Sequence, residues 1–274
     1  NLALPAWLPA AWVATYYRLL DKAIIDPLIV PQLNLFRAEL GLAATRRVFH
    51  QDIFSPQLNL CLVPEWFAMP QPDWPLNSRC TGFVAYQPQA TALPVAVEDF
   101  LQAGSAPLVF TAGTAMRHSG LARAFFESAV QASVLLKRRA ILLTTQEQHI
   151  PADLPHGILH QPYLPLDRLL PHAAAFIFHG GIGSVAQAFA AGVPQLVMPM
   201  SQDQPDNAAR IRRLGVGDIL LPNQFRSVRL AHTLENLLAN EILQQRCKEY
   251  QARVNFAAAL VQTCDALEAL IKPL

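Results

Sequence analysis

The sequence predicts an α/β protein whose main part is a doubly wound parallel sheet within residues 107–240. Short apolar runs, typical of buried strands, alternate there with segments of helical periodicity. One run, 173–178, leads directly into a glycine-rich turn and an alanine-rich helix. The protein has 274 residues, of which 52% are hydrophobic and 15% charged, which supplies enough apolar side chains for a large core.

The strands of the sheet are expected at the apolar runs, and the helices between them. The expected strands are 107–112, 140–145, 158–161, 173–178, 195–200 and 217–221. The expected helices are 119–137, with Ser119 as its cap, 185–191, 207–214 and 228–239. Strands and helices that alternate in this order imply a parallel, doubly wound sheet.

The flanking segments are predicted to be less regular. We expect helices at 10–20, 24–40 and 95–103, strands at 57–63 and 83–85, and a long helix at 242–271. The first twenty residues are apolar and aromatic. They could form the wall of an apolar acceptor pocket or contact a membrane surface, but a helix packed on a sheet is the favoured interpretation.

Composition narrows the function classes. The formal net charge of +1 gives no basic field for nucleic acid. The four cysteines, Cys61, Cys80, Cys247 and Cys264, are scattered, which argues against a zinc site or a disulfide framework and is typical of a reducing compartment. The sequence contains no spanning apolar run and no signal-peptide pattern. We therefore expect a cytoplasmic protein.

The glycine-rich turn predicts an anion site. His179 follows a strand, and Gly180, Gly181, Gly183 and Ser184 lead into the next helix. Backbone N–H groups and the partial positive charge of a helix start attract phosphate, and glycine allows close backbone approach. A turn that merely closes a tight connection is the alternative. The combination with His179, Ser184 and the polar cluster described next favours a ligand.

A second polar cluster follows one strand later, at Asp203 and Gln204. Parallel strands end at one edge of the sheet, and ligands of open α/β sheets bind there. A carboxylate accepts hydrogen bonds and an amide both donates and accepts them, so the pair suits sugar hydroxyls. The residues alone therefore predict a phosphorylated, hydroxyl-rich ligand.

The stretch from Tyr163 to Gln204 resembles the nucleotide-sugar signature of the UDP-glycosyltransferase superfamily, the inverting GT-B glycosyltransferases. The matching residues are Tyr163-Leu164-Pro165-Leu166, Leu170, His172, His179, Gly181, Gly183, Ser184, Gly192, Pro194, Pro199, Asp203 and Gln204. The resemblance is closest to bacterial members such as the rhamnosyltransferase of rhamnolipid synthesis and the sterol glucosyltransferase-like proteins. It covers most of 106–272 and, more loosely, 30–90.

The resemblance implies a GT-B organisation. Residues 107–240 would be the nucleotide-sugar donor domain, with a Rossmann-like sheet, and 1–88 the remaining part of the N-terminal acceptor domain. Residues 89–106 would be the linker, and 241–274 a C-terminal helix that crosses back to the N-terminal part.

The resemblance also implies roles for individual residues. The diphosphate would be held by His179, Gly180, Gly181, Gly183 and Ser184, together with Thr111, Gly113 and Thr114 of the loop after the first strand. Tyr163 and Leu164 would hold the base, and Gln187 would replace the glutamate that binds the ribose. Asp203 and Gln204 would hold the donor sugar. The site would need no metal and no cofactor besides the donor substrate.

The expected function is inverting transfer of a hexose from a UDP- or dTDP-sugar to a hydroxyl of a hydrophobic or lipid acceptor, with peripheral association at the inner membrane. The family's catalytic base is an early histidine of the N-terminal domain, which we expect upstream of Asn1. The protein as given would then bind donor without transferring it. Two alternatives are a non-catalytic nucleotide-sugar-binding or regulatory subunit and a GT-B-fold nucleotide-sugar epimerase.

Overall fold

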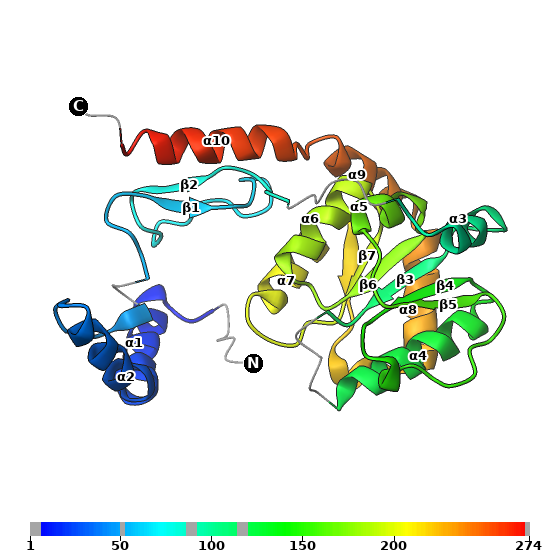
Figure 1. Cartoon of the computed structure of the whole chain (residues 1–274), viewed down its shortest axis with the longest axis horizontal. Helices are drawn as coiled ribbons and strands as arrows, with labels where there is room; N and C mark the ends of the chain where they lie inside the picture. The colour runs from blue at the N-terminus through cyan, green and yellow to red at the C-terminus, as the bar shows by residue number, and fades with distance from the viewer. Residues whose placement is uncertain (1–6, 50–52, 86–91, 114–119, 272–274) are drawn as a thin grey trace. The chain divides into compact units, whose positions relative to one another are not determined.

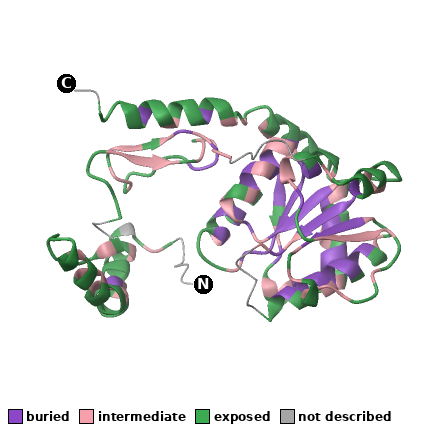
Figure 2. Cartoon of the chain, viewed as in Figure 1, coloured by how far each residue is buried: buried purple, intermediate pink, exposed green. Residues whose placement is uncertain are grey.

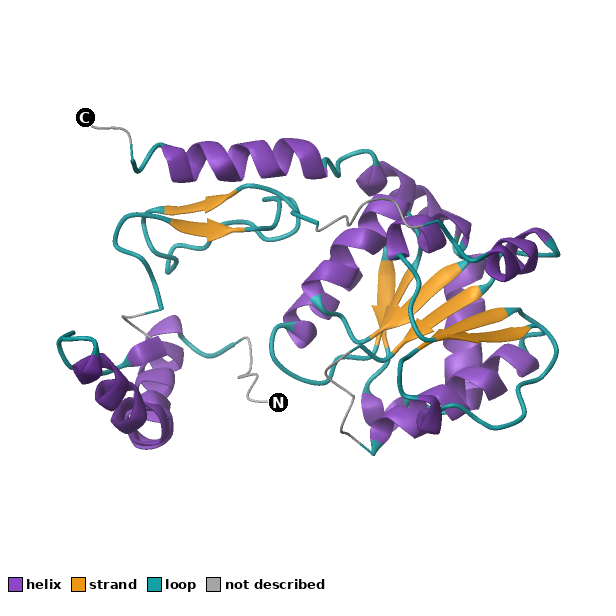
Figure 3. Cartoon of the chain, viewed as in Figure 1, coloured by secondary structure: helices purple, strands orange, loops and turns teal. Residues whose placement is uncertain are grey.

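A computed structural model describes residues 7–49, 53–85, 92–113 and 120–271. The chain divides into two compact units. The first unit comprises Asn1–Cys61, Pro70–Cys80 and Glu268–Leu274, and the second comprises Leu62–Met69 and Thr81–Leu267. Figure 1 shows the course of the chain through both units, and Figure 3 its helices and strands.

The first unit begins with helices. Helix α1 (Ala10–Leu20) continues through a π-helical turn, η1 (Asp21–Ile25), into α2 (Asp26–Glu39). The N–H of Asp26 donates to the carbonyl of Asp21, five residues back. Pro27 and Pro31 lack an N–H donor, so the regular ladder of α2 is interrupted at both positions. The two expected helices are therefore present and joined without a loop.

A short parallel pair of strands completes the described part of this unit. Strand β1 (Asn59–Cys61) pairs with β2 (Ser78–Cys80), with Leu60 opposite Arg79. The prediction of a strand at 57–63 is confirmed in shortened form. The prediction of a strand at 83–85 is wrong, since β2 lies five residues earlier in the chain. Phe83 instead packs its ring into an aromatic cluster of the second unit.

The second unit contains the predicted parallel sheet. Within the described residues its strands follow the order β5-β4-β3-β6-β7-β8, all parallel. Their bounds are β3 Leu108–Thr111, β4 Ala140–Leu143, β5 Ile158–Gln161, β6 Ala175–Phe178, β7 Gln195–Val197 and β8 Gly217–Ile219. Chain order reverses between β3 and β6, as in doubly wound dinucleotide-binding folds. The predicted fold class is confirmed.

Helices cover both faces of this sheet. Helix α4 (Leu121–Leu135) packs against α8 (Ser227–Ala239), while α6 (Ile182–Ala191) contacts α7 (Gln204–Leu214) and α9 (Glu241–Gln251). The shorter helical elements are α3 Val95–Gln102, η4 Glu147–His149, α5 Leu166–Leu169, η5 Leu170–His172 and η6 Pro222–Gln224. Figure 2 shows the strands buried between the helices. Ser119, the expected cap of the helix after β3, lies outside the described residues.

The central strands are entirely buried, which explains their continuous apolar sequence. Every residue of β4 and β6 is buried, and the rings of Phe176 and Phe178 stack with centroids 4.4 Å apart. Parallel strands covered on both faces are expected to be apolar throughout, without alternation. The sheet edge where the strands end is therefore positioned by a rigid core.

A second apolar cluster joins 62–69 to the sheet unit. The ring centroid of Trp66 lies 5.0 Å from the centroids of both Phe189 and Tyr250. The ring centroids of Phe67 and Phe83 are 5.3 Å apart. Phe67 and Phe189 are each 1% exposed. Aromatic rings with centroids at these distances stabilise such clusters beyond their burial alone.

The C-terminal region differs from the prediction of one long helix. Helix α9 ends at Gln251 and α10 (Phe256–Glu268) begins after Asn255, whose side-chain oxygen accepts a hydrogen bond from the N–H of Ala258 at 2.9 Å. Asparagine at a helix start is a strong capping residue, and it begins a new helix here. In the described part of the chain, no helix combines the length and the apolar character needed to cross a membrane.

Candidate functional site

The predicted site residues gather where β3 and β6 end side by side. Thr111 of β3 pairs in register with Phe178 of β6, so Ala112-Gly113 and His179-Gly180 leave the sheet as neighbours. Chain order reverses at this pair of strands, which is where open α/β sheets bind their ligands. The topology therefore places both predicted phosphate loops at one point.

His179 lies against two glycines of these loops. A β-carbon at Gly113 would overlap the imidazole ring, and one at Gly181 would lie 2.6 Å from its Nε2. Gly113 also has φ +64°, a conformation that side chains other than glycine's rarely adopt. The two glycines thus leave the room that the histidine ring occupies.

The environment of His179 keeps its imidazole neutral near pH 7. Burial lowers the pKa of His179 from its ordinary value of 6.5, and the nearby carboxylate of Asp203 opposes this by raising it. The Nδ1 atom is buried and has no hydrogen-bond partner among the described residues. A neutral imidazole donates through one nitrogen and accepts through the other. A buried ring nitrogen without a partner is unfavourable, so its position beside the glycine turn favours a ligand that bonds to it.

Helix α6 begins at the same place. Gly181 is its N-cap and provides no side chain to bond the first N–H groups. Those groups are unsatisfied within a helix and attract an anion. Gly183, in the first turn, is exposed, and a β-carbon there would meet no protein atom within 4 Å. The helix start therefore faces open space over Gly183.

A cavity of about 240 Å³ opens beside this point. Its wall includes Thr111, Gly113 and Ser184 from the predicted diphosphate residues and Tyr163 and Leu164 from the predicted base residues. Leu164 is buried, whereas the ring of Tyr163 is 67% exposed and stands free at the rim. The structure thus brings base and diphosphate residues to a common hollow. Thr114 lies outside the described residues.

Sequence reasoning missed one wall of this cavity. Thr144, Thr145, Gln146 and His149 line it from the segment that follows β4. The Nε2 atom of His149 is buried and has no partner among the described residues. The available signal was their place after the carboxyl end of an apolar strand, where polar side chains of an α/β sheet meet ligands.

Gln187, the predicted ribose residue, lies in the second turn of α6. Its side-chain oxygen Oε1 is buried and has no hydrogen-bond partner among the described residues. Burying an unpaired polar group is unfavourable, so such an atom is a good acceptor for a hydroxyl group.

The two predicted sugar residues differ in their surroundings. Asp203 is exposed, and its Oδ2 accepts a hydrogen bond from Nδ2 of Asn207 at 2.7 Å. Gln204 is 4% exposed, and its Oε1 accepts from the N–H groups of Met200 at 2.9 Å and Ser201 at 3.3 Å. Its oxygen therefore closes the loop before α7.

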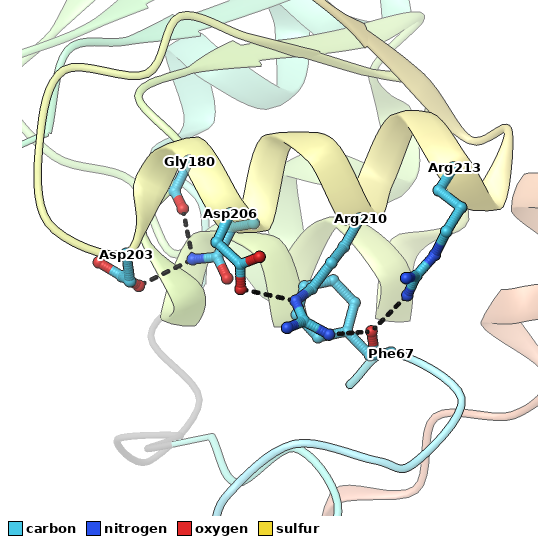
Figure 4. A network of polar contacts seen from close by, with 7 residues as sticks. Phe67, Gly180, Asp203, Asp206, Arg210 and Arg213 are labelled. Atoms are coloured by element: carbon cyan, nitrogen blue, oxygen red, sulfur yellow. Dashed lines mark hydrogen bonds and ion pairs between the residues drawn. The ribbon is translucent and has the colours of Figure 1, made fainter. Parts of the chain in front are cut away.

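Two arginines of α7 bind the segment 62–69. Nη1 of Arg210 and Nη2 of Arg213 both donate to the carbonyl oxygen of Phe67, at 3.1 and 3.3 Å. Arg210 also pairs with Asp206 at 2.7 Å (Figure 4). Helix α7 thus carries Asp203 at its start and holds 62–69 near its end. Among the described residues, no group of three or more His, Cys, Asp or Glu side chains could hold a metal ion.

Sequence comparison identifies relatives for this arrangement. The C-terminal domain of the erythromycin biosynthesis protein CIII-like family matches residues 131–264. O-mycaminosyltylonolide 6-deoxyallosyltransferase of Streptomyces fradiae is 34% identical over 198 residues, 67% of this chain and 43% of that protein. NDP-glycosyltransferase YjiC of Bacillus licheniformis is 24% identical over 232 residues, 81% of this chain and 56% of that protein. The chain thus spans about half the length of these relatives.

Solved structures share the fold. The glycotransferase of kitacinnamycin superposes with a TM-score of 0.72 at 19% identity, covering 94% of this chain and 66% of that one. Spinosyn forosaminyltransferase SpnP superposes with a TM-score of 0.69 at 22% identity, and the match covers 94% of this chain and 67% of that one. The expected GT-B fold is confirmed by these likenesses. The matched domain, the named relatives and the shared fold together show that this chain belongs to the UDP-glycosyltransferase superfamily.

Proposed function

We propose that this chain holds a nucleoside-diphosphate sugar at the carboxyl edge of its sheet and serves transfer of the hexose to an acceptor hydroxyl. One observation carries the proposal. His179 is packed between Gly113 and Gly181 with a buried, unpaired Nδ1, beside the uncapped start of α6. Such a combination of an unpaired ring nitrogen and free backbone N–H groups suits a diphosphate.

The remaining residues divide the donor among them. The diphosphate lies on the start of α6, where Ser184 adds a hydroxyl donor and Thr111 and Gly113 line the opposite side. The base enters the cavity beneath Tyr163 and Leu164, and the unpaired Oε1 of Gln187 accepts from the ribose. Asp203, exposed at the start of α7, accepts from hydroxyls of the sugar.

The chemistry of transfer then follows from where charge develops. The acceptor oxygen bonds to the anomeric carbon from the face opposite the diphosphate, which inverts that centre. The bond from the anomeric carbon to the diphosphate oxygen breaks, and its electron pair stays on the diphosphate. The α6 dipole and His179 stabilise this charge without a metal ion. The hydroxyl proton passes to a base, which we assign to no residue of the described part.

The names of the relatives support a nucleoside-diphosphate-sugar donor. One relative is a 6-deoxyallosyltransferase, another a mycarosyltransferase, and a third an NDP-glycosyltransferase. The rhamnosyltransferase SpnG, which shares the fold, has been solved with thymidine diphosphate and with spinosyn aglycone. A hydrophobic acceptor is further supported by exposed apolar side chains of the first unit, among them Trp12 at 70% and Leu28 at 71%.

Calorimetric titration of the 274-residue protein with UDP, dTDP, UDP-glucose and dTDP-rhamnose tests the proposal. We expect heat of binding with one nucleotide series, and a loss of affinity of about 10- to 100-fold in His179→Ala, as for removal of a hydrogen bond to a charged group. His232→Ala, an exposed histidine of α8, is the matched control and should bind like the parent protein.

The outcomes separate the candidate functions. Binding that is unaffected by His179→Ala would remove His179 from the site. An absence of heat with all four nucleotides would contradict the proposal. Tight binding without transfer to a lipid or phenolic acceptor would indicate a donor-binding protein that lacks its catalytic base. Interconversion of the sugar without an acceptor would favour the epimerase.

A further inference from the structure

Asn207 is a buried polar residue at the centre of the site that the sequence did not single out. It lies in the first half of α7 and is 5% exposed. Its Nδ2 donates to the carbonyl oxygen of Gly180 at 2.9 Å and to Oδ2 of Asp203 at 2.7 Å (Figure 4). Both partners can only accept hydrogen bonds, so the amide nitrogen must be the atom that faces them.

The bond to Gly180 fixes the orientation of one peptide group. A planar trans peptide points its carbonyl and its N–H in opposite directions. With the Gly180 carbonyl held against α7, the N–H of Gly181 is directed away from α7. Gly180 has φ +92°, and a β-carbon there would lie 2.7 Å from Cγ1 of Val197, so the turn is also packed tightly. Asn207 thus selects the direction of an N–H at the α6 cap.

The bond to Asp203 fixes the carboxylate. Asp203 is the N-cap of α7, where an aspartate side chain ordinarily accepts from the backbone of its own helix. Its side chain makes no such capping bond here. One oxygen accepts from Asn207 instead, and the carboxylate lies near enough to His179 to raise the pKa of that residue. The side chain is thereby oriented by Asn207 at the expense of the usual cap.

We propose that Asn207 is a positioning residue of the donor site. Through one amide nitrogen it sets both the turn that receives the diphosphate and the carboxylate that receives the sugar. The proposal rests on the proposed function for the identity of the ligand. It makes no demand that Asn207 itself touch the donor, since its nitrogen is occupied on both sides by protein acceptors.

The test compares Asn207→Ala and Asn207→Asp with Asn236→Ala, an exposed asparagine of α8. Asn207→Asp keeps the shape but sets an acceptor against two acceptors. The readout is the ratio of affinities for a nucleotide sugar and its nucleoside diphosphate. We expect this ratio to fall by about tenfold in both Asn207 variants, the size of one hydrogen bond to a charged group, and to stay unchanged in Asn236→Ala.

A double-mutant cycle with Asp203→Ala separates positioning from general support. If Asn207 acts on the sugar through Asp203, Asn207→Ala no longer changes the ratio once Asp203 is absent. A structural role alone would lower the free energy of unfolding and would weaken both ligands equally. That result, or an unchanged ratio in Asn207→Asp, would overturn the proposal.

A measurement on the ligand-free protein keeps this test separate from the proposed function. The backbone amide resonance of Gly181 should shift in Asn207→Ala and stay in place in Asn236→Ala. If the parent protein binds none of the nucleotides, the proposed function fails, and the Gly181 amide still reports whether Asn207 orients the turn. An unmoved Gly181 resonance would contradict the positioning role whatever the ligand.

Discussion

The imidazole of His179 occupies the space that a β-carbon of residue 113 would need. The two residues lie at the ends of adjacent strands, β3 and β6, and are separated by 66 positions in the sequence. Gly113 is therefore required by its neighbour as well as by its own backbone conformation. The predicted site depends on this packing.

Gly113→Ala should lower the free energy of unfolding by about 2–5 kcal/mol, because a left-handed conformation costs about 1–2 kcal/mol and overpacking about 1–3 kcal/mol. Urea denaturation measures this. Gly157→Ala is the matched control, because Gly157 also has positive φ (+86°) while its β-carbon would lie 3.7 Å from Cγ of Arg139, an ordinary contact. Equal losses of unfolding free energy in the two variants would show that the His179 side chain moves away from the added methyl group without an energetic cost.

Gly183→Ala should separate stability from binding. No protein atom lies near its β-carbon position, and alanine favours helix over glycine by up to about 1 kcal/mol, so the free energy of unfolding should rise or stay constant. The added methyl group would intrude where we expect the diphosphate. Calorimetry with UDP and dTDP should therefore show weaker binding. If the variant is more stable and binds UDP or dTDP as tightly as the parent protein, the diphosphate does not lie at Gly183.

The pKa of His179 predicts a pH dependence of stability. The unfolded protein titrates this group near its ordinary pKa of about 6.5, and burial places the folded pKa lower. Between the two values the unfolded state binds more protons, so stability falls as pH drops from about 6.5 through the folded pKa. Urea denaturation at successive pH values should show this loss.

The His179→Gln variant should lack that part of the pH dependence. Asp203→Asn should enlarge it, because the carboxylate is the group that raises the pKa of His179. A parent protein and a His179→Gln variant with parallel stability profiles over this pH range would show that His179 is not buried in its neutral form.

Phe67→Ala should destabilise the sheet unit although residue 67 precedes β3 by about 40 positions. The ring is 1% exposed and packs against Phe83 and Phe189, so its removal should cost about 3–5 kcal/mol. Leu62→Ala, half-exposed in the same segment, is the control and should cost far less. Calorimetric unfolding should show the effect. If the unfolding temperature of the sheet unit is unchanged in Phe67→Ala, the segment 62–69 does not contribute to the stability of that unit.

The sheet could be predicted because its strands are buried on both faces, which makes their sequences uniformly apolar. For that reason β4 and β6 could be predicted from their sequences. The parallel arrangement could be predicted from the alternation of strands with helices. The prediction of a strand at 83–85 is wrong because Phe83 is buried in a cluster of aromatic rings, against Phe189 and Phe67, and not in a strand. Hydrophobic patterns report burial and leave open whether a strand or a ring cluster accounts for it.

The sequence alone could suggest a candidate site where its residues form one continuous stretch, as in 179–184, and their binding role stays a prediction. Contacts that join distant stretches could not. Asn207 bonds to Gly180 across 27 positions, and its spacing in the sequence only marks it as a polar residue of α7. The cavity wall at His149 arises because β4 lies next to β3, which becomes visible only in the sheet.

The reversal of strand order between β3 and β6 has an evolutionary consequence. The hollow at that point is produced by the path of the backbone. Side chains around it can therefore be substituted while the hollow itself is retained. Proteins with only 19–22% identity retain the same architecture. The position of the hollow is thus a property of the fold, whereas the choice of ligand is a property of the side chains in the loops.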